Sequence, residues 1–116
     1  MVVTLSMTIE IHTPKKGLEE SVLRLVKLSI IRFTQVYQGI SRIECTIRED
    51  GRVSPVENKV CEIRVNMYGE NLFTHSRSDT YAHSVREALN HCGEQIALLA
   101  SRAKELPDKV TSTVKV

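Results

Sequence analysis

Hydrophobic and polar residues alternate at the start of the chain. From residue 3 to residue 11 every odd position is apolar and every even position is polar. Because successive side chains of a strand point to opposite faces, this period of two predicts a half-buried strand. The segment 13–17 then breaks the pattern, since Pro14 cannot donate to a strand ladder and Gly17 favours a bend.

Two longer segments repeat their apolar residues every three or four positions, as amphipathic helices do. The first covers residues 18–38, and Gly39 is expected to end it. The second begins at Tyr81, after polar residues that are suited to capping a first turn, and is closed by Pro107. We therefore predict two helices, each with one buried face, and a mobile tail over residues 107–116.

Three further strands are predicted between the two helices. Residues 42–48 and 62–68 each alternate apolar with polar side chains, and turn-forming residues between them indicate a hairpin loop of several residues. A symmetric hairpin would place Cys45 and Cys61 near one another. Residues 72–77 can form a fourth strand, but their pattern does not say which face is buried.

The resulting order, β-α-β-β-β-α, defines one α+β domain over residues 1–106. We expect a two-layer sandwich in which a four-stranded antiparallel sheet carries both helices on one face and leaves the other face polar. A chain of 116 residues is long enough to bury one such core.

Composition excludes several classes of protein. Hydrophobic residues make up 41% of the chain and charged residues 26%, which is typical of a globular domain. The longest apolar run is Ile96–Ala100, far short of the roughly 20 residues that cross a bilayer. The N-terminus lacks the basic region of a secretory signal, so we expect a cytoplasmic protein. Its three cysteines form no C-x-x-C pair and are expected to be reduced core residues.

The sequence contains no nucleophile elbow, phosphate-binding loop, dinucleotide-binding glycine motif or H-E-x-x-H, so we expect neither enzymatic activity nor a cofactor. The strongest metal candidate is a set of imidazoles and carboxylates that share one face of the last helix: His83, Glu87, His91 and Glu94. That face lies opposite the apolar stripe, where mixed charge is typical of a solvated surface. We therefore expect no bound metal.

Positive charge is concentrated around the first helix. The whole chain carries a net charge of only +2, but residues 15–38 hold five basic and two acidic side chains. Such a cluster can bind phosphates, whose contacts position a protein on a nucleic acid without reading its sequence. On composition alone, an ordinary solvated helix surface is the simpler explanation.

Three apolar residues fall outside the faces that the helices should bury. Helical-wheel positions place Leu28 and Ile31 beside basic residues of the first helix, and Leu98 near His91 on the second. This pattern favours a contact surface for a protein partner or a second copy of the chain.

Several segments together resemble the ribosome hibernation promoting factor family, the ribosome-associated translation inhibitors also called sigma-54 modulation proteins. The resemblance is carried by residues 58–67, by Gly69 and Leu72-Phe73, and by 78–81 leading into Gln95-Ile96. With residues 7–13 and 36–40 it spans about residues 7–106. It implies a fold similar to a double-stranded RNA-binding domain, and the chain is similar to a short form of the family.

The resemblance further implies a stress-response protein that binds the small ribosomal subunit in the channel for messenger and transfer RNA and inhibits translation. Basic residues of the family are replaced here by Gly93-Glu94, by Leu98 and Ala100, and near Leu28 and Ser29. A diverged relative that uses Leu28, Ile31 and Leu98 as a protein or homodimer interface is the alternative. The residues that we expect to contact ribosomal RNA are Lys15, Lys16, Arg24, Lys27, Arg32, Arg86, Arg102 and Lys104.

Overall fold

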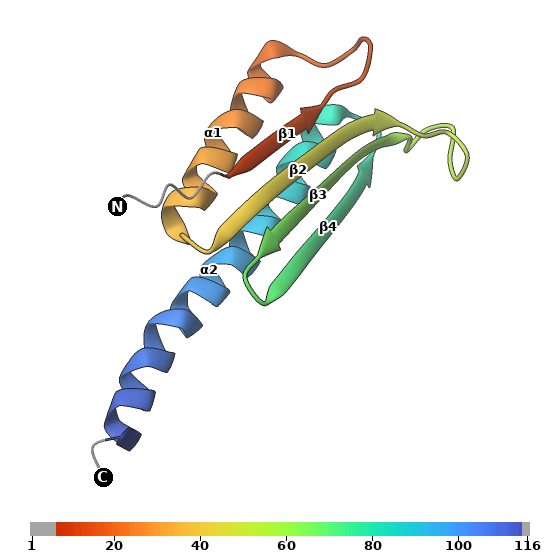
Figure 1. Ribbon diagram of the computed structural model, residues 1–116. Coiled ribbons are helices and arrows are strands. Elements are labelled where there is room, and N and C mark those ends of the chain that lie inside the picture. The colour runs from red at the N-terminus through yellow and green to blue at the C-terminus, as the bar shows by residue number, and fades with distance from the viewer. Residues whose placement is uncertain (1–6, 115–116) are drawn as a thin grey trace.

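The computed structural model describes the backbone of residues 7–114 and the side chains of residues 7–102. The predicted order of elements is confirmed, as Figure 1 shows. Residues 3–6 of the first predicted strand lie outside the described part of the chain. The elements are β1 (Thr8–His12), α1 (Glu20–Val36), β2 (Ile40–Glu49), β3 (Lys59–Met67), β4 (Glu70–Ser78) and α2 (Tyr81–Val114).

The sheet is mixed rather than antiparallel. Its strand order is β1-β2-β3-β4, and the pairs β2–β3 and β3–β4 are antiparallel as predicted. The prediction is wrong for β1, which pairs in parallel with β2 from Thr8 opposite Arg42 to His12 opposite Thr46. The reason is that α1 crosses over between these two adjacent strands and returns the chain to the end of the sheet where β1 began.

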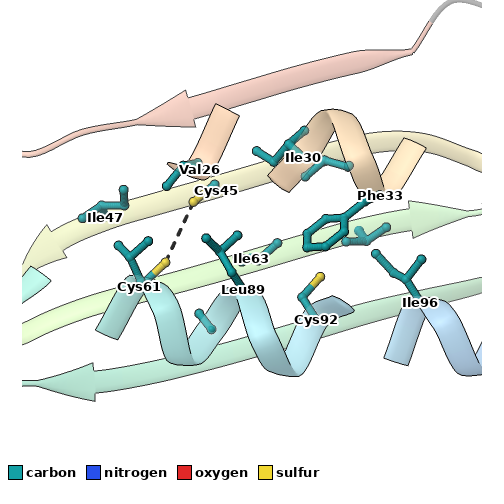
Figure 2. Close-up of a cluster of buried hydrophobic side chains, with 14 of the residues drawn as sticks. Val26, Ile30, Phe33, Cys45, Ile47, Cys61, Ile63, Leu89, Cys92 and Ile96 are labelled. Atoms are coloured by element: carbon teal, nitrogen blue, oxygen red, sulfur yellow. Dashed lines mark hydrogen bonds between the residues drawn. The ribbon is translucent and has the colours of Figure 1, made fainter. Parts of the chain in front are cut away.

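The core lies between the sheet and the two helices, which cover the same face (Figure 1). Alternate residues of β2 and β3 are buried, such as Ile43 and Ile63, and they pack against apolar stripes of both helices. Figure 2 shows side chains from α1, α2 and the sheet meeting in this layer. The period of two in β2 and β3 and the helical stripes thus identified the core face of these elements correctly. In β1 the period of two is a poorer guide, because Ile9 is 42% exposed.

The cysteines are buried and free, as expected. Cys45 and Cys61 lie on neighbouring strands with their Sγ atoms 3.9 Å apart (Figure 2). This contact, together with burial, raises the pKa of the Cys61 thiol, and burial raises the pKa of Cys92 to about 12. Because the thiolate is the reactive form, these cysteines act as packing residues.

Strand β4 turns polar side chains toward the core. Thr74, Ser76 and Ser78 are buried, whereas Phe73 and His75 are exposed on the opposite face. In the part of the chain that the structure describes, the hydroxyls of Thr74 and Ser76 have no hydrogen-bond partner. This orientation settles the facing of β4, which the sequence left open because neither of its faces is uniformly apolar.

Helix α2 extends further than predicted. The hydroxyl of Thr80 accepts a hydrogen bond of 3.2 Å from the backbone N–H of His83, which confirms the predicted cap. At its other end the helix continues past Pro107 to Val114 and projects beyond the sheet (Figure 1). A proline removes a single backbone hydrogen bond, so a helix can continue through it. No helix in the described residues is both long and apolar enough to cross a membrane.

Candidate nucleic-acid interface on the helical layer

The basic residues predicted to bind RNA lie on the helical layer. This layer comprises residues 15–36 and 81–102, and seven of the eight predicted residues are exposed there. The side chain of Lys104 lies outside the described residues. The seven exposed residues are Lys15 and Lys16 before α1, Arg24, Lys27 and Arg32 on α1, and Arg86 and Arg102 on α2.

The seven cations form no ion pairs among the described side chains. Across the side chains of residues 7–102, none of them lies within ion-pair distance of a carboxylate. The helical layer carries seven basic and four acidic residues, whereas residues 7–14 and 37–80 carry six basic and eight acidic. The helical layer therefore has a net charge of +3, whereas the other described residues have a net charge of −2.

On the outer face of the sheet, by contrast, several basic residues are held in ion pairs. Arg42 lies 3.0 Å from Glu10 and 3.7 Å from Glu44, and Arg48 lies 3.2 Å from Glu62. A guanidinium that already holds a carboxylate has less to gain from a phosphate, because the new contact would break the old one. The sheet face is thus the weaker candidate for a polyanion.

One buried carboxylate fixes the loop between β2 and β3. Asp50 is 8% exposed and bonds Arg52 through two hydrogen bonds of 2.9 Å and Arg48 through one of 3.0 Å. Arg77 of β4 donates to the Asp50 carbonyl at 2.8 Å and to the Glu57 carbonyl at 3.0 Å. Hydrogen bonds from Arg52 and Arg48 hold the pKa of Asp50 well below its usual range. The residue pattern at this position predicts only a turn.

A groove runs between the two helices. It measures about 330 Å³, and its apolar lining includes Leu25, Phe33 and Leu89. Arg32 of α1 lines the same groove. A smaller hollow of about 270 Å³ shares Leu25, Leu89 and other lining residues with it and adds Arg86 of α2. The fold therefore brings two predicted RNA-binding residues, one from each helix, to two adjoining hollows.

The other predicted contacts are spread along the layer. Lys16 lines a separate cleft at the N-terminal ends of both helices, together with Glu19, Glu49 and Asp79. That cleft has mixed charge and suits a phosphate poorly. At 1.5 Å per residue, Arg102 lies about 24 Å along α2 from Arg86. The cations thus form a band along the helices, with Arg32 at the groove and Arg86 at the hollow that adjoins it.

The three apolar residues predicted to form a contact surface are exposed. Leu28 is 60% exposed, Ile31 is 49% and Leu98 is 55%. Leu28 lines the interhelical groove beside Arg32, while Leu98 lies on the other helix. Their exposure confirms the helical-wheel argument, and their role as an interface stays a prediction.

The histidines do not form the metal site considered from the sequence. Of that set, the contact seen in the described residues is His83 with Glu87, at 3.4 Å. The three ligand atoms that come within 4.8 Å of one another belong instead to Glu10, His12 and Glu44 on β1 and β2. Because Arg42 already binds both of these carboxylates, the cluster is a surface ion-pair network.

Fold and charge together define a class of molecule, an α+β sandwich whose helical layer is cationic. Comparison with protein-family models finds no match, and neither does comparison with curated proteins. Two solved structures share the fold. A ribosomal subunit interface protein from Coxiella burnetii has a TM-score of 0.55 and 17% identity, covering 82% of this chain and 99% of that one. The N-terminal domain of Protein Y from Thermus thermophilus has a TM-score of 0.60 and 12% identity, covering 81% of this chain and 98% of that one.

At these identities the likeness establishes the fold. It is the fold that the resemblance to the hibernation promoting factor family implied, so that expectation is confirmed. The two comparisons cover nearly the whole of each solved chain, and about four-fifths of this one. The helices and strands that position the cationic band therefore belong to the shared architecture.

Proposed function

We propose that this protein is a ribosome-associated translation inhibitor that binds the small ribosomal subunit through its helical layer. The observation that carries the proposal is the band of seven exposed cations without acidic partners among residues 7–102. The resemblance of the sequence to hibernation factors supports it. So does the fold shared with a ribosomal subunit interface protein.

Ribosomal RNA is a ligand that suits this surface. Folded RNA is bound largely through its shape and its phosphates, so a rigid cationic layer is sufficient and no catalytic group is required. The proposed site on the subunit is the channel for messenger and transfer RNA, where a bound protein blocks translation by occupying space. We accordingly propose a binding protein of the cytoplasm rather than an enzyme.

Co-sedimentation of the purified protein with small ribosomal subunits tests the proposal. We expect the protein to sediment with the subunits at low salt and to be released as salt rises, because each phosphate contact releases counterions. A protein that stays at the top of the gradient at every salt concentration would contradict the proposal. Large subunits serve as the control for unspecific binding to RNA.

A second function, homodimerisation or binding of another protein, is favoured by the exposure of Leu28, Ile31 and Leu98. In this case apolar contacts would replace the basic contacts of the hibernation factors. Light scattering, which measures the oligomeric state of the purified protein, distinguishes this second function from ribosome binding by a monomer. A dimer that Leu98→Glu converts into a monomer, in a protein that does not sediment with ribosomes, would favour this second function.

A further inference from the structure

The interhelical groove has a composition that phosphate binding alone does not explain. A phosphate needs donors and positive charge, yet the lining of this groove includes Leu25, Phe33 and Leu89. Phe33 and Leu89 are buried at the bottom of the groove, so its accessible apolar surface belongs to Leu28, which is 60% exposed, and to the half-buried Leu25. Covering that surface with a flat, weakly hydrated group is favourable, because it removes apolar area from water. Cationic residues lie at the groove as well, since Arg32 lines it and Arg86 lines the hollow that adjoins it.

We propose that this groove holds one unpaired nucleotide of the bound RNA, with its base on the apolar lining and its flanking phosphates at Arg32 and Arg86. The inference rests on the proposed function and deepens it, because it names the part of the RNA that is recognised. Charge complementarity supports this occupant, since both guanidiniums lack a carboxylate partner in the described part of the chain. The volume of about 330 Å³ accommodates a single base and its ribose.

An unpaired nucleotide fits better than a duplex. In a double helix the bases are stacked inside, and only phosphates and groove edges can approach a protein surface. A duplex would bridge Arg32 and Arg86 and leave the apolar lining between them uncovered. A splayed base, by contrast, removes that lining from water and places its own phosphates beside the guanidiniums.

Two polar side chains give the groove a means of reading the base. Asn90 is exposed and Ser29 half-buried, and both line the groove and the adjoining hollow. The Asn90 amide offers two donors and one acceptor, and the Ser29 hydroxyl offers one donor and an acceptor. These groups can bond the edge of a base whose face lies on the leucines. We therefore infer a preference among bases, with Asn90 as a specificity-determining residue.

Titration of isotope-labelled protein with the four nucleoside 5′-monophosphates tests the inference by nuclear magnetic resonance. Ribose 5-phosphate and inorganic phosphate are the matched probes without a base. We expect the nucleotides to shift the amide resonances of residues 25–33 and 86–93 and to bind roughly fivefold or more tightly than ribose 5-phosphate, as base stacking on a protein surface allows. Asn90→Ala should weaken the binding of the preferred nucleotide by roughly two- to tenfold. His91→Ala changes an exposed neighbour and should leave that affinity unchanged.

Several results would overturn the inference. Equal shifts from nucleotides and from inorganic phosphate would indicate a phosphate site only, and shifts confined to the sheet would place the base elsewhere. Perturbation of the groove by an acidic, leucine-containing peptide but by none of the nucleotides would assign the groove to a protein. The proposed function is judged separately by sedimentation with subunits. A protein that binds subunits but no nucleotide disproves only the inference. A protein that binds nucleotides but no subunits disproves only the proposed function.

Discussion

Gly93 of α2 packs directly against Phe33 of α1. A Cβ at Gly93 would lie 3.2 Å from Cε1 of the Phe33 ring, closer than side chains ordinarily approach. This glycine stands where the resembled family carries a basic residue, so the replacement has a packing consequence as well as an electrostatic one. The absence of a side chain at Gly93 lets α1 and α2 approach each other closely at the groove.

Filling this contact should destabilise the fold. Gly93→Leu forces a branched side chain against Phe33, and overpacking of this kind typically costs 1–3 kcal/mol, or about 2 kcal/mol at the midpoint. Urea denaturation followed by circular dichroism measures the change. Ala97→Leu, at an exposed position of the same helix, is the control and should have little effect. Equal stability of the two variants would show that the helices can move apart without cost.

Removing the groove cations should weaken RNA binding in a salt-dependent way. Arg32→Gln and Arg86→Gln each delete one exposed cation, so each should lower the slope of log affinity against log salt by about 0.7–0.9. Binding to small subunits across a salt series measures both quantities. Arg64→Gln changes the charge equally on the sheet face, where Arg64 lies 4.7 Å over the Phe73 ring. An equal loss of affinity in the Arg64→Gln control would show that RNA also contacts the sheet face, which contradicts binding through the helical layer.

Adding charge to the helical layer should strengthen binding. Glu94 is exposed on α2, and Glu94→Arg replaces a repulsive group with one that can contact a phosphate. We expect the affinity for small subunits to rise and the salt slope to steepen by about one. Glu70→Arg, on the sheet side of the molecule, should produce neither effect. A rise in affinity for both variants would mean that overall net charge, rather than the helical layer, governs binding.

The polar side chains of β4 that face the core should be replaceable with a gain in stability. A buried hydroxyl without a hydrogen bond costs about 1–3 kcal/mol in desolvation, and Thr74 is such a residue in the described part of the chain. Thr74→Val keeps the shape and removes the hydroxyl, so the free energy of unfolding should increase by about 1 kcal/mol. Thermal unfolding measures this change, with Thr46→Val on the polar face of β2 as the control. A loss of stability would show that the Thr74 hydroxyl has a partner in solution.

The Asp50 network should make stability depend on pH in the acidic range. Because the folded protein holds the pKa of Asp50 below its ordinary value near 4, the carboxylate stabilises the fold fully above that pH. Its contribution is lost as the pH falls toward the pKa of the folded state. Asp50→Asn should therefore unfold at lower urea than the wild type at pH 7, and the difference should shrink below about pH 4. Glu57→Gln, an exposed acid of the same loop, should show no such dependence.

Local patterns in the sequence predicted the elements and the core, because strand and helix periodicities depend on neighbouring residues alone. The parallel pairing of β1 could not be predicted in this way, since it depends on how the crossover through α1 places two distant segments. The Asp50 network was missed for the same reason, because Arg48, Arg52 and Arg77 converge on it from different strands and a loop.

The candidate site was predicted residue by residue, and its geometry was not. Arg32 and Arg86 were expected to contact RNA, but only the packing of α1 against α2 shows that Arg32 lines the interhelical groove and Arg86 the hollow that adjoins it. The mixed charge around Lys16 was equally hidden, because Glu19, Glu49 and Asp79 belong to three different segments. A sequence indicates which face of each helix meets solvent, and the register between helices decides which residues meet each other.

The separation of charge between the two layers has a kinetic consequence. With an excess of bases on the helices and of acids on the sheet, the molecule has a dipole moment that crosses the sandwich. The electric field of a polyanion exerts a torque on this dipole, which turns the helices toward the ligand before the surfaces touch. A larger fraction of collisions then occurs in the productive orientation. The association rate constant is therefore higher than the net charge of only +2 would suggest.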